Sequence, residues 1–182
     1  MMYPPLIKIL KETKHNLNII IVGDGTLYEK AVSICKKSGF FHRFKFLKSI
    51  PHKDVLMHHI NSDIYVSANT DGNLINTNLE AISANACMVI PKPQHDKFID
   101  IETHKLLDKL VVYYEVNNIN DLQQKIIDLL DNPNKIKYAN SIPMKFYKST
   151  KFFVNFDWDK KNKLITEYKH PAYITCEELF NK

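Results

Sequence analysis

Cysteine is scarce in this sequence, with three residues among 182 and no C-x-x-C pair. Cys35, Cys87 and Cys176 are far apart, and at least two of them lie in apolar segments. Such spacing offers no disulfide framework and is typical of reduced, buried thiols in a cytosolic protein. The first fifteen residues alternate charged and apolar side chains, which is not the pattern of a signal peptide. We therefore expect a cytoplasmic protein.

Long apolar runs and blocks of like charge are also missing. No apolar stretch approaches the ~20 residues that a membrane-spanning helix needs, so we expect membrane association to be peripheral at most. The net charge of +5 is spread along the chain without a run of five like charges. Nucleic-acid-binding proteins ordinarily gather their basic residues into a patch. The sequence therefore argues against nucleic acid as a partner.

Motifs of metal-dependent and nucleophilic catalysis are absent as well. The eight histidines form no H-E-x-x-H motif and no Cys/His cluster with the spacing of a metal site. A G-x-S-x-G nucleophile elbow is also missing. We expect neither a metal ion nor a bound cofactor.

What the sequence does contain is an alternation of apolar strands with amphipathic helices. Hydrophobic residues make up 45% of the chain, enough to fill the core of one domain spanning residues 1–182. We expect strands at 17–22, 43–47, 64–68, 87–90 and 111–114, and helices at 4–15, 27–38, 53–61, about 80–84, from 120, and 134–147. Alternation of this kind predicts an α/β fold, a Rossmann-like parallel sheet flanked by helices.

Three details of this pattern can be checked directly. The continuous apolar run 17–22 is typical of a central strand covered on both faces. The pairs Thr26 with Glu29 and Asn120 with Gln123 have the spacing of capping boxes at helix starts. The tail from about residue 134 is expected to be helical and to end in a helix around 158–168.

The centre of the pattern is the segment 63–91, which reads as strand, loop, helix and strand. In such a unit the loop and the start of the helix lie at the carboxyl end of the first strand, where parallel sheets bind ligands. Glu80 is the only carboxylate on the expected helix and stands among apolar residues. It is either a solvated side chain or a ligand-binding residue, and spacing alone does not decide between them.

A second candidate is the glycine pair Gly23 and Gly25, which follows a strand and precedes a helix. This is half of a dinucleotide-binding fingerprint, but Tyr28 occupies the place of the third glycine. On its own the pair favours a tight turn over a phosphate-binding loop.

Five segments in order resemble one known family. They are VGDGT at 22–26, FLKSIPHKDV at 46–55, the unit 63–91 with its LEA at 79–81, NDLQQKIIDLLDNP at 120–133 and FDWDKK at 156–161. Together they resemble the C-terminal half of a retaining GT-B glycosyltransferase of family 4 (GT4), the glycogen-synthase and mannosyltransferase type. The resemblance covers nearly the whole chain.

The resemblance implies a site for a nucleotide-sugar donor, a UDP- or GDP-sugar. The glutamate of LEA would accept hydrogen bonds from the ribose hydroxyls, backbone N–H groups just before it would face the diphosphate or sugar, and the turn 50–52 would lie against the base. The donor-binding residues implied are Glu80, Asn73, Asn76, Thr77, Asn78, Ile50, Pro51, His52, Gly23 and Gly25.

Two departures from the family affect catalysis. The acidic residue expected eight positions before Glu80, with seven residues between them, is replaced by Gly72, so Asp71, one step out of register, is the candidate for the sugar contact. The family also carries, upstream, a strand followed by an Arg and a Lys that neutralise the leaving diphosphate, and an acceptor-binding domain. This sequence begins at the helix after that strand, so we expect the isolated chain to be inactive.

In the usual strand order 3-2-1-4-5-6 the missing strand would lie inside the sheet. We therefore expect a gap with open strand edges that another segment or chain covers. The expected partners are an acceptor-domain protein or further copies of the chain.

Two other functions are compatible with the sequence. The chain could be a non-catalytic interaction or regulatory module derived from a glycosyltransferase, which the departures favour. It could also be a simpler Rossmann-like binder of another nucleotide, although that reading leaves the five-segment resemblance unexplained.

Overall fold

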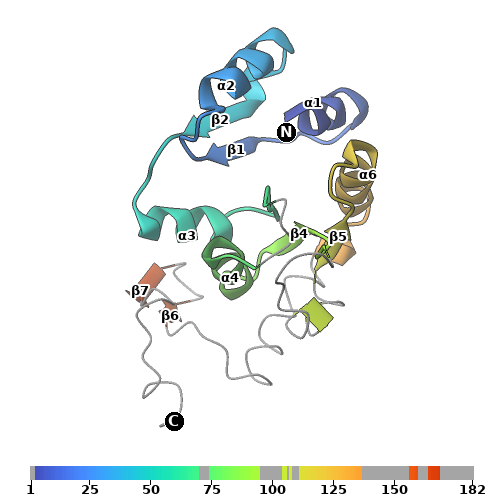
Figure 1. Ribbon diagram of the computed structural model, residues 1–182. Coiled ribbons are helices and arrows are strands. Elements are labelled where there is room, and N and C mark those ends of the chain that lie inside the picture. Colours follow the sequence, from blue (N-terminus) through green and yellow to red (C-terminus); the bar gives the residue numbers. More distant parts are fainter. Residues whose placement is uncertain are drawn as a thin grey trace.

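The computed structural model describes residues 3–69, 74–94, 104, 105, 107 and 111–136, together with two strands near the C-terminus (Figure 1). The order of elements is α1 (Tyr3–Glu12), β1 (Ile19–Val22), α2 (Tyr28–Lys37), η1 (Phe41–Arg43), β2 (Phe44–Leu47), α3 (His52–Ile60), β3 (Ile64–Val66), α4 (Asn76–Ser83), β4 (Cys87–Pro91), β5 (Val112–Tyr114), α6 (Ile119–Leu130), β6 (Phe156–Asp159) and β7 (Leu164–Tyr168). The five strands from β1 to β5 pair only in parallel, so the α/β class with parallel sheets flanked by helices is confirmed.

The better packed part of the fold is the three-stranded sheet β3-β4-β5. All five residues of its central strand β4 are buried. Because side chains alternate along a strand, Cys87 and Val89 face a cluster built by α1 and α6, whereas Met88 and Ile90 face α4. Both faces of β4 are therefore covered by helices. A continuous apolar run is what such a strand requires.

The strands β1 and β2 form a separate two-stranded sheet. On the face of β2 that contacts α2, the ring of Phe46 packs against Tyr28 and Phe44. On the opposite face of β1, Ile20 and Val22 keep 40% and 43% of their surface exposed. The expectation that this strand is covered on both faces is wrong. An apolar run is buried only where neighbouring elements lie over it, and the described helices leave this face open.

The five parallel strands are divided between two sheets, with no described pairing from one sheet to the other. β1 pairs only with β2, and β3 pairs only with β4, among the strands that the structure describes. Each of these two strands thus has one edge without a described strand partner. The helix α1 joins the two parts, because it packs against α6 beside the larger sheet and also contacts α2, as Figure 1 shows.

The two expected capping boxes are wrong. α2 begins at Tyr28, its N-cap is Leu27, and no side chain caps it. The cap of α6 is Asn118, whose side-chain oxygen accepts the backbone N–H of Asp121 at 3.0 Å. A capping box is recognised in sequence only by the spacing of two residues. The actual N-cap is the residue at which the backbone enters the helix, and the spacing does not fix that position.

The helix expected around Trp158, Leu164 and Tyr168 is also wrong. Residues 156–159 and 164–168 form the antiparallel pair β6-β7. Both segments contain aromatic residues and the second also contains β-branched residues, and both kinds favour strands. Of the helix expected at 134–147, residues 134–136 are helical, and the remainder lies outside the described residues.

The expectation of buried thiols is confirmed for two cysteines. Cys35 and Cys87 are free and fully buried, whereas Cys176 lies outside the described residues. Burial raises the pKa of the Cys87 thiol to about 11, because an apolar environment disfavours the thiolate.

Candidate functional site

The candidate site lies where the carboxyl ends of β2 and β3 lead into the helices α3 and α4. The chain leaves β2, passes Ile50 and Pro51, and enters α3 at His52. Pro51 is the N-cap of α3 with φ of −56°, a value that its ring enforces. α3 and α4 contact each other. The start of α3, which follows β2, therefore lies beside the helix that follows β3.

Glu80 is the central side chain of this site. Its carboxylate is only 1% exposed, and Oε1 lies 3.2 Å from Nδ1 of His52, whose side chain is 56% exposed. A buried carboxylate is costly unless polar groups compensate its charge. Of the two readings open from sequence, the solvated side chain is excluded. The structure also brings together two residues that the sequence assigned to different parts of the site, the base-binding turn and the ribose contact.

Asn78 is held inward by two hydroxyl groups. Its Oδ1 accepts hydrogen bonds from the hydroxyl of Tyr65 at 3.2 Å and from Oγ of Ser67 at 3.4 Å. The hydroxyl of Tyr114 donates to the carbonyl of Ser67 at 3.0 Å. These bonds attach the first turn of α4 to the end of β3. The buried side chain of Asn78 therefore stabilises the position of α4 beside β3. The side chain of Asn76, by contrast, is exposed.

Tyr65 and Ser67 were missed by the sequence reasoning. Desolvation raises the pKa of Tyr65 to about 12, with the negative charges of Glu80 and of ionised Tyr114 acting in the same direction and the Ser67 hydrogen bond against it. The hydroxyl consequently stays protonated near neutral pH and continues to donate to Asn78. The sequence feature that could have indicated them is the presence of two hydroxyl side chains in and just after the strand that leads into the loop.

His59 is a further buried residue that the sequence reasoning did not select. Its ring packs edge-on against Tyr65 with centroids 4.8 Å apart, and its Nε2 has no hydrogen-bond partner among the described residues. Burial lowers the pKa of His59 to about 4, and the neighbouring His58 adds to this. His59 is therefore neutral near pH 7.

The glycine pair forms a turn at the end of β1. Gly23 has φ of +140°, which side chains rarely permit, and its N–H donates to the carbonyl oxygens of Leu47 and Lys48. The carbonyl of Gly25 accepts the N–H of Tyr28 at 2.8 Å. The pair continues the β1-β2 contact and leads into α2, as the tight-turn reading predicts.

The structure describes only some of the remaining candidate site residues. Asp71 and Asn73 lie outside the described residues. Thr77 is partly exposed in the first turn of α4, next to exposed Asn76. Ile75, the N-cap of this helix, makes no side-chain cap. The start of α4 thus presents backbone N–H groups near Glu80, an arrangement that favours anions.

The described residues also bear on metal binding and on membrane association. Within those residues, no group of three or more histidine, cysteine, aspartate or glutamate side chains could hold a metal ion. No described helix is long and apolar enough to cross a membrane.

Comparisons with known proteins identify the fold and a family match. The description "Glycosyl transferases group 1" matches residues 5–143. Sucrose-phosphate synthase from Thermosynechococcus elongatus superposes with a TM-score of 0.66 at 10% identity, over 81% of this chain and 37% of that one. The C-terminal domain of a glycosyl transferase group 1 family protein from Francisella tularensis gives 0.64 at 13% identity, over 81% of this chain and 75% of that one.

These likenesses show a GT-B-type fold, and at such identities they show the fold alone. The chain spans little more than a third of the sucrose-phosphate synthase. No match was found among curated protein sequences.

Proposed function

Because this chain belongs to the glycosyl transferases group 1, with residues 5–143 matching that family, we propose that it binds a nucleotide-sugar donor for sugar transfer. The donor is a UDP- or GDP-sugar, and the transfer retains the anomeric configuration without a metal ion, as in family GT4. The chain corresponds to the C-terminal, donor-binding half of such an enzyme.

The buried carboxylate of Glu80 carries this proposal. A carboxylate can accept two hydrogen bonds from a vicinal diol, which suits the ribose of a nucleotide. In the proposed complex the turn from Ile50 to His52 lies against the base, with Gly23 and Gly25 beside it. Backbone N–H groups at the start of α4 contact the diphosphate. Asp71 and Asn73 contact the transferred sugar.

A thermal-shift titration with UDP, GDP, ADP and their common sugar conjugates tests the proposal. A ligand stabilises the folded state to which it binds, so one nucleotide should raise Tm selectively. Glu80→Gln keeps the size of the side chain and removes its charge. We expect it to weaken donor binding at least tenfold, about 1.4 kcal/mol.

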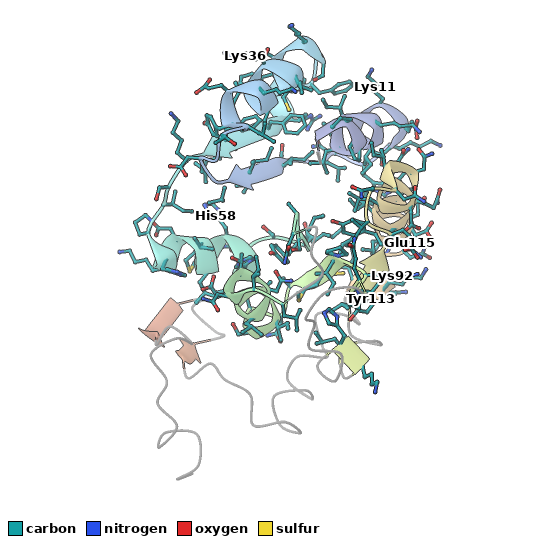
Figure 2. All side chains as sticks on the ribbon, viewed as in Figure 1. Lys11, Lys36, His58, Lys92, Tyr113 and Glu115 are labelled. Carbon is teal, nitrogen blue, oxygen red and sulfur yellow. The ribbon has the colours of Figure 1, made fainter. Side chains whose placement is uncertain are left out.

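Glu115→Gln is the matched control for this titration. Glu115 is exposed and paired with Lys92 on the α6 side of the molecule, away from α3, as Figure 2 shows. This variant should bind the nucleotide as the wild type does. An unchanged dissociation constant for Glu80→Gln would remove Glu80 from the site.

Complete transfer is proposed to need a separate acceptor-binding half. The open edges of β1 and β3 support this part of the proposal, since an exposed strand edge invites pairing with another segment. An acceptor-domain protein or a second copy of the chain would provide that half. The setting is proposed to be the cytoplasm, with membrane contact at most peripheral.

The exposed face of β1 favours a second candidate function, a non-catalytic interaction module. Ile20 and Val22 form a small apolar surface of a kind that often contacts partners. If a well-folded sample binds none of the nucleotides at millimolar concentration, this second function is supported and the proposed donor site is ruled out.

A further inference from the structure

Two buried polar residues join the end of β3 to the first turn of α4. Asn78 in α4 and Ser67, just after β3, each keep only 1% of their surface exposed. Oδ1 of Asn78 accepts hydrogen bonds from the hydroxyl of Tyr65 at 3.2 Å and from Oγ of Ser67 at 3.4 Å. Burying a side-chain amide is costly unless its polar atoms have partners. The two hydroxyls satisfy the oxygen of this amide.

The nitrogen of the same amide is not used in this way. The hydrogen bonds described for the Asn78 side chain both use Oδ1, and neither uses Nδ2. Among the described residues, the enclosed side-chain atoms without a hydrogen-bond partner are Nε2 of His59 and Oε1 of Gln123. Nδ2 of Asn78 is not one of these enclosed atoms, so solvent reaches it. A ligand can therefore accept a hydrogen bond from Nδ2.

The neighbouring hydroxyls decide which way the amide faces. The N–H of Asn69 donates to Oγ of Ser67 at 3.4 Å, and the Ser67 hydroxyl in turn donates to Asn78. The Tyr65 hydroxyl stays protonated near neutral pH, because desolvation raises its pKa to about 12. Both hydroxyls thus donate to the same branch of the planar amide. With Oδ1 towards them, Nδ2 is directed away from them.

The same turn of α4 also offers backbone N–H groups. Those of Asn78 and Leu79 donate to the carbonyl of Ile75 at 2.8 and 3.2 Å. The N–H groups of Asn76 and Thr77 precede these bonds, and the N-cap Ile75 has no side chain that accepts from them. Such groups at a helix start favour an anion. Nδ2 of Asn78 adds a side-chain donor to this turn, and several donors together suit the oxygens of a diphosphate.

We propose that Asn78 donates from Nδ2 to an oxygen of the diphosphate of the donor, and that Tyr65 is the positioning residue that orients this amide. The hydroxyl of Tyr65 acts by holding Oδ1 of Asn78 and does not itself contact the donor. The diphosphate is thus recognised by a side chain as well as by the backbone of α4. This inference rests on the proposed function.

Calorimetric titration of the full chain with UDP and with GDP tests this inference. Tyr65→Phe keeps the ring that packs against His59 and removes only the hydroxyl. Asn78→Asp keeps an oxygen for both hydroxyls and replaces the donating nitrogen by an acceptor. We expect the dissociation constant of the bound nucleotide to rise about fivefold in Tyr65→Phe and about tenfold or more in Asn78→Asp.

The double variant separates positioning from simple structural support. Both branches of a carboxylate are oxygens, so Tyr65 has no orientation to select in the Asn78→Asp variant. Tyr65→Phe should therefore add no further loss of affinity in that background, as a double-mutant cycle measures. Structural support alone would lower the Tm of the free protein and would weaken binding equally in both backgrounds.

Asn78→Ala removes the amide without adding a charge. We expect it to weaken nucleotide binding about fivefold. It takes the place of Asn78→Asp in the cycle if that variant does not fold.

Tyr113→Phe is the matched control for Tyr65→Phe. The hydroxyl of Tyr113 lies 2.8 Å from Nδ1 of His104. Tyr113 belongs to β5, in the same sheet as Tyr65, but lies on the side of the molecule away from His58 and α3, as Figure 2 shows. This variant should bind the nucleotide as the wild type does.

The outcomes for this inference and for the proposed function differ. If the wild type binds a nucleotide and either Tyr65→Phe or the Asn78 variant binds it equally well, this inference is overturned and the donor site remains. Full additivity in the double variant overturns the positioning role of Tyr65. Absence of binding by the wild type overturns the donor site and this inference together.

Discussion

The two sheets of this protein use similar sequences in different surroundings. β1 reads IIIV and has no buried residue, whereas β4 reads CMVIP and has only buried residues. The difference lies in the neighbours. Among the described elements, β4 has a strand on each side and helices over both faces, whereas β1 has one strand partner and one open face. Hydrophobicity marks a segment as a strand, but the elements around it decide how much free energy its burial contributes.

The candidate site draws on both parts. Gly23 follows β1, and His52 begins the helix that leads from the smaller sheet to the larger one. Glu80 and Asn78 belong to α4, which packs on the larger sheet. A ligand that contacts both sets of residues would hold the two parts together. The less buried smaller sheet is thus expected to gain the most stability from the proposed donor.

The largest expected effect compares the same deletion in the two sheets. Ile90 in β4 is buried and Ile20 in β1 is 40% exposed. Ile90→Ala should lower the free energy of unfolding by about 2–5 kcal/mol, because it leaves a cavity. Ile20→Ala should cost about 1 kcal/mol or less, since little buried contact is lost. Urea denaturation measures both. Equal losses would show that β1 is as well packed as β4.

A second prediction concerns how the free energy of unfolding depends on pH through His59, which lies on α3 beside the larger sheet. The pKa of His59 is lowered to about 4, below the ordinary value of about 6.5 in an unfolded chain. As the pH falls, His59 therefore binds a proton in the unfolded state before it does so in the folded state. The contribution of neutral His59 is fully present above pH 6.5 and is lost as the pH falls towards 4, by up to about 3 kcal/mol.

His59→Phe tests this prediction, because it keeps a ring against Tyr65 and cannot titrate. Urea denaturation at pH 7.5 and 4.5 should show a smaller acid loss for this variant than for the wild type. His42→Gln, at an exposed position, should follow the wild type. The same acid loss in all three proteins would contradict a buried, neutral His59.

The smallest expected effects compare helix caps in the two parts. Asn118→Ala removes the side-chain cap of α6 and should destabilise the fold by about 1 kcal/mol. Leu27→Asp places a capping side chain at the uncapped start of α2 and should stabilise it by about 0.5–1 kcal/mol. Shifts of Tm in opposite directions are expected. A loss of stability in Leu27→Asp would mean that exposed Leu27 makes packing contacts of greater value than a cap.

Much of the fold could be predicted from local sequence. The five strands β1 to β5 and the helices between them lie close to their expected positions, because strand and helix periodicity is a local property. The helix cap at Asn118 and the pair β6-β7 were missed. In the first case the turn of the backbone decides the cap, and in the second the aromatic and β-branched residues outweighed a helical pattern.

The site could be predicted in its parts but not in its arrangement. Glu80 and His52 were each selected from sequence, yet their contact joins residues 28 positions apart and depends on how α3 packs against α4. Tyr65 and Ser67 were not selected, because a hydroxyl in a strand has no special meaning until its partner Asn78 is placed beside it.

The sequence by itself determined the α/β alternation, the family resemblance and the position of the candidate residues at strand ends. These properties depend on residues near one another in the chain. Only the tertiary structure decided that β4 is buried while β1 is open, and that the carboxylate of Glu80 lies out of water beside His52. Burial and charge compensation depend on what packs around a residue, and those neighbours come from distant parts of the sequence.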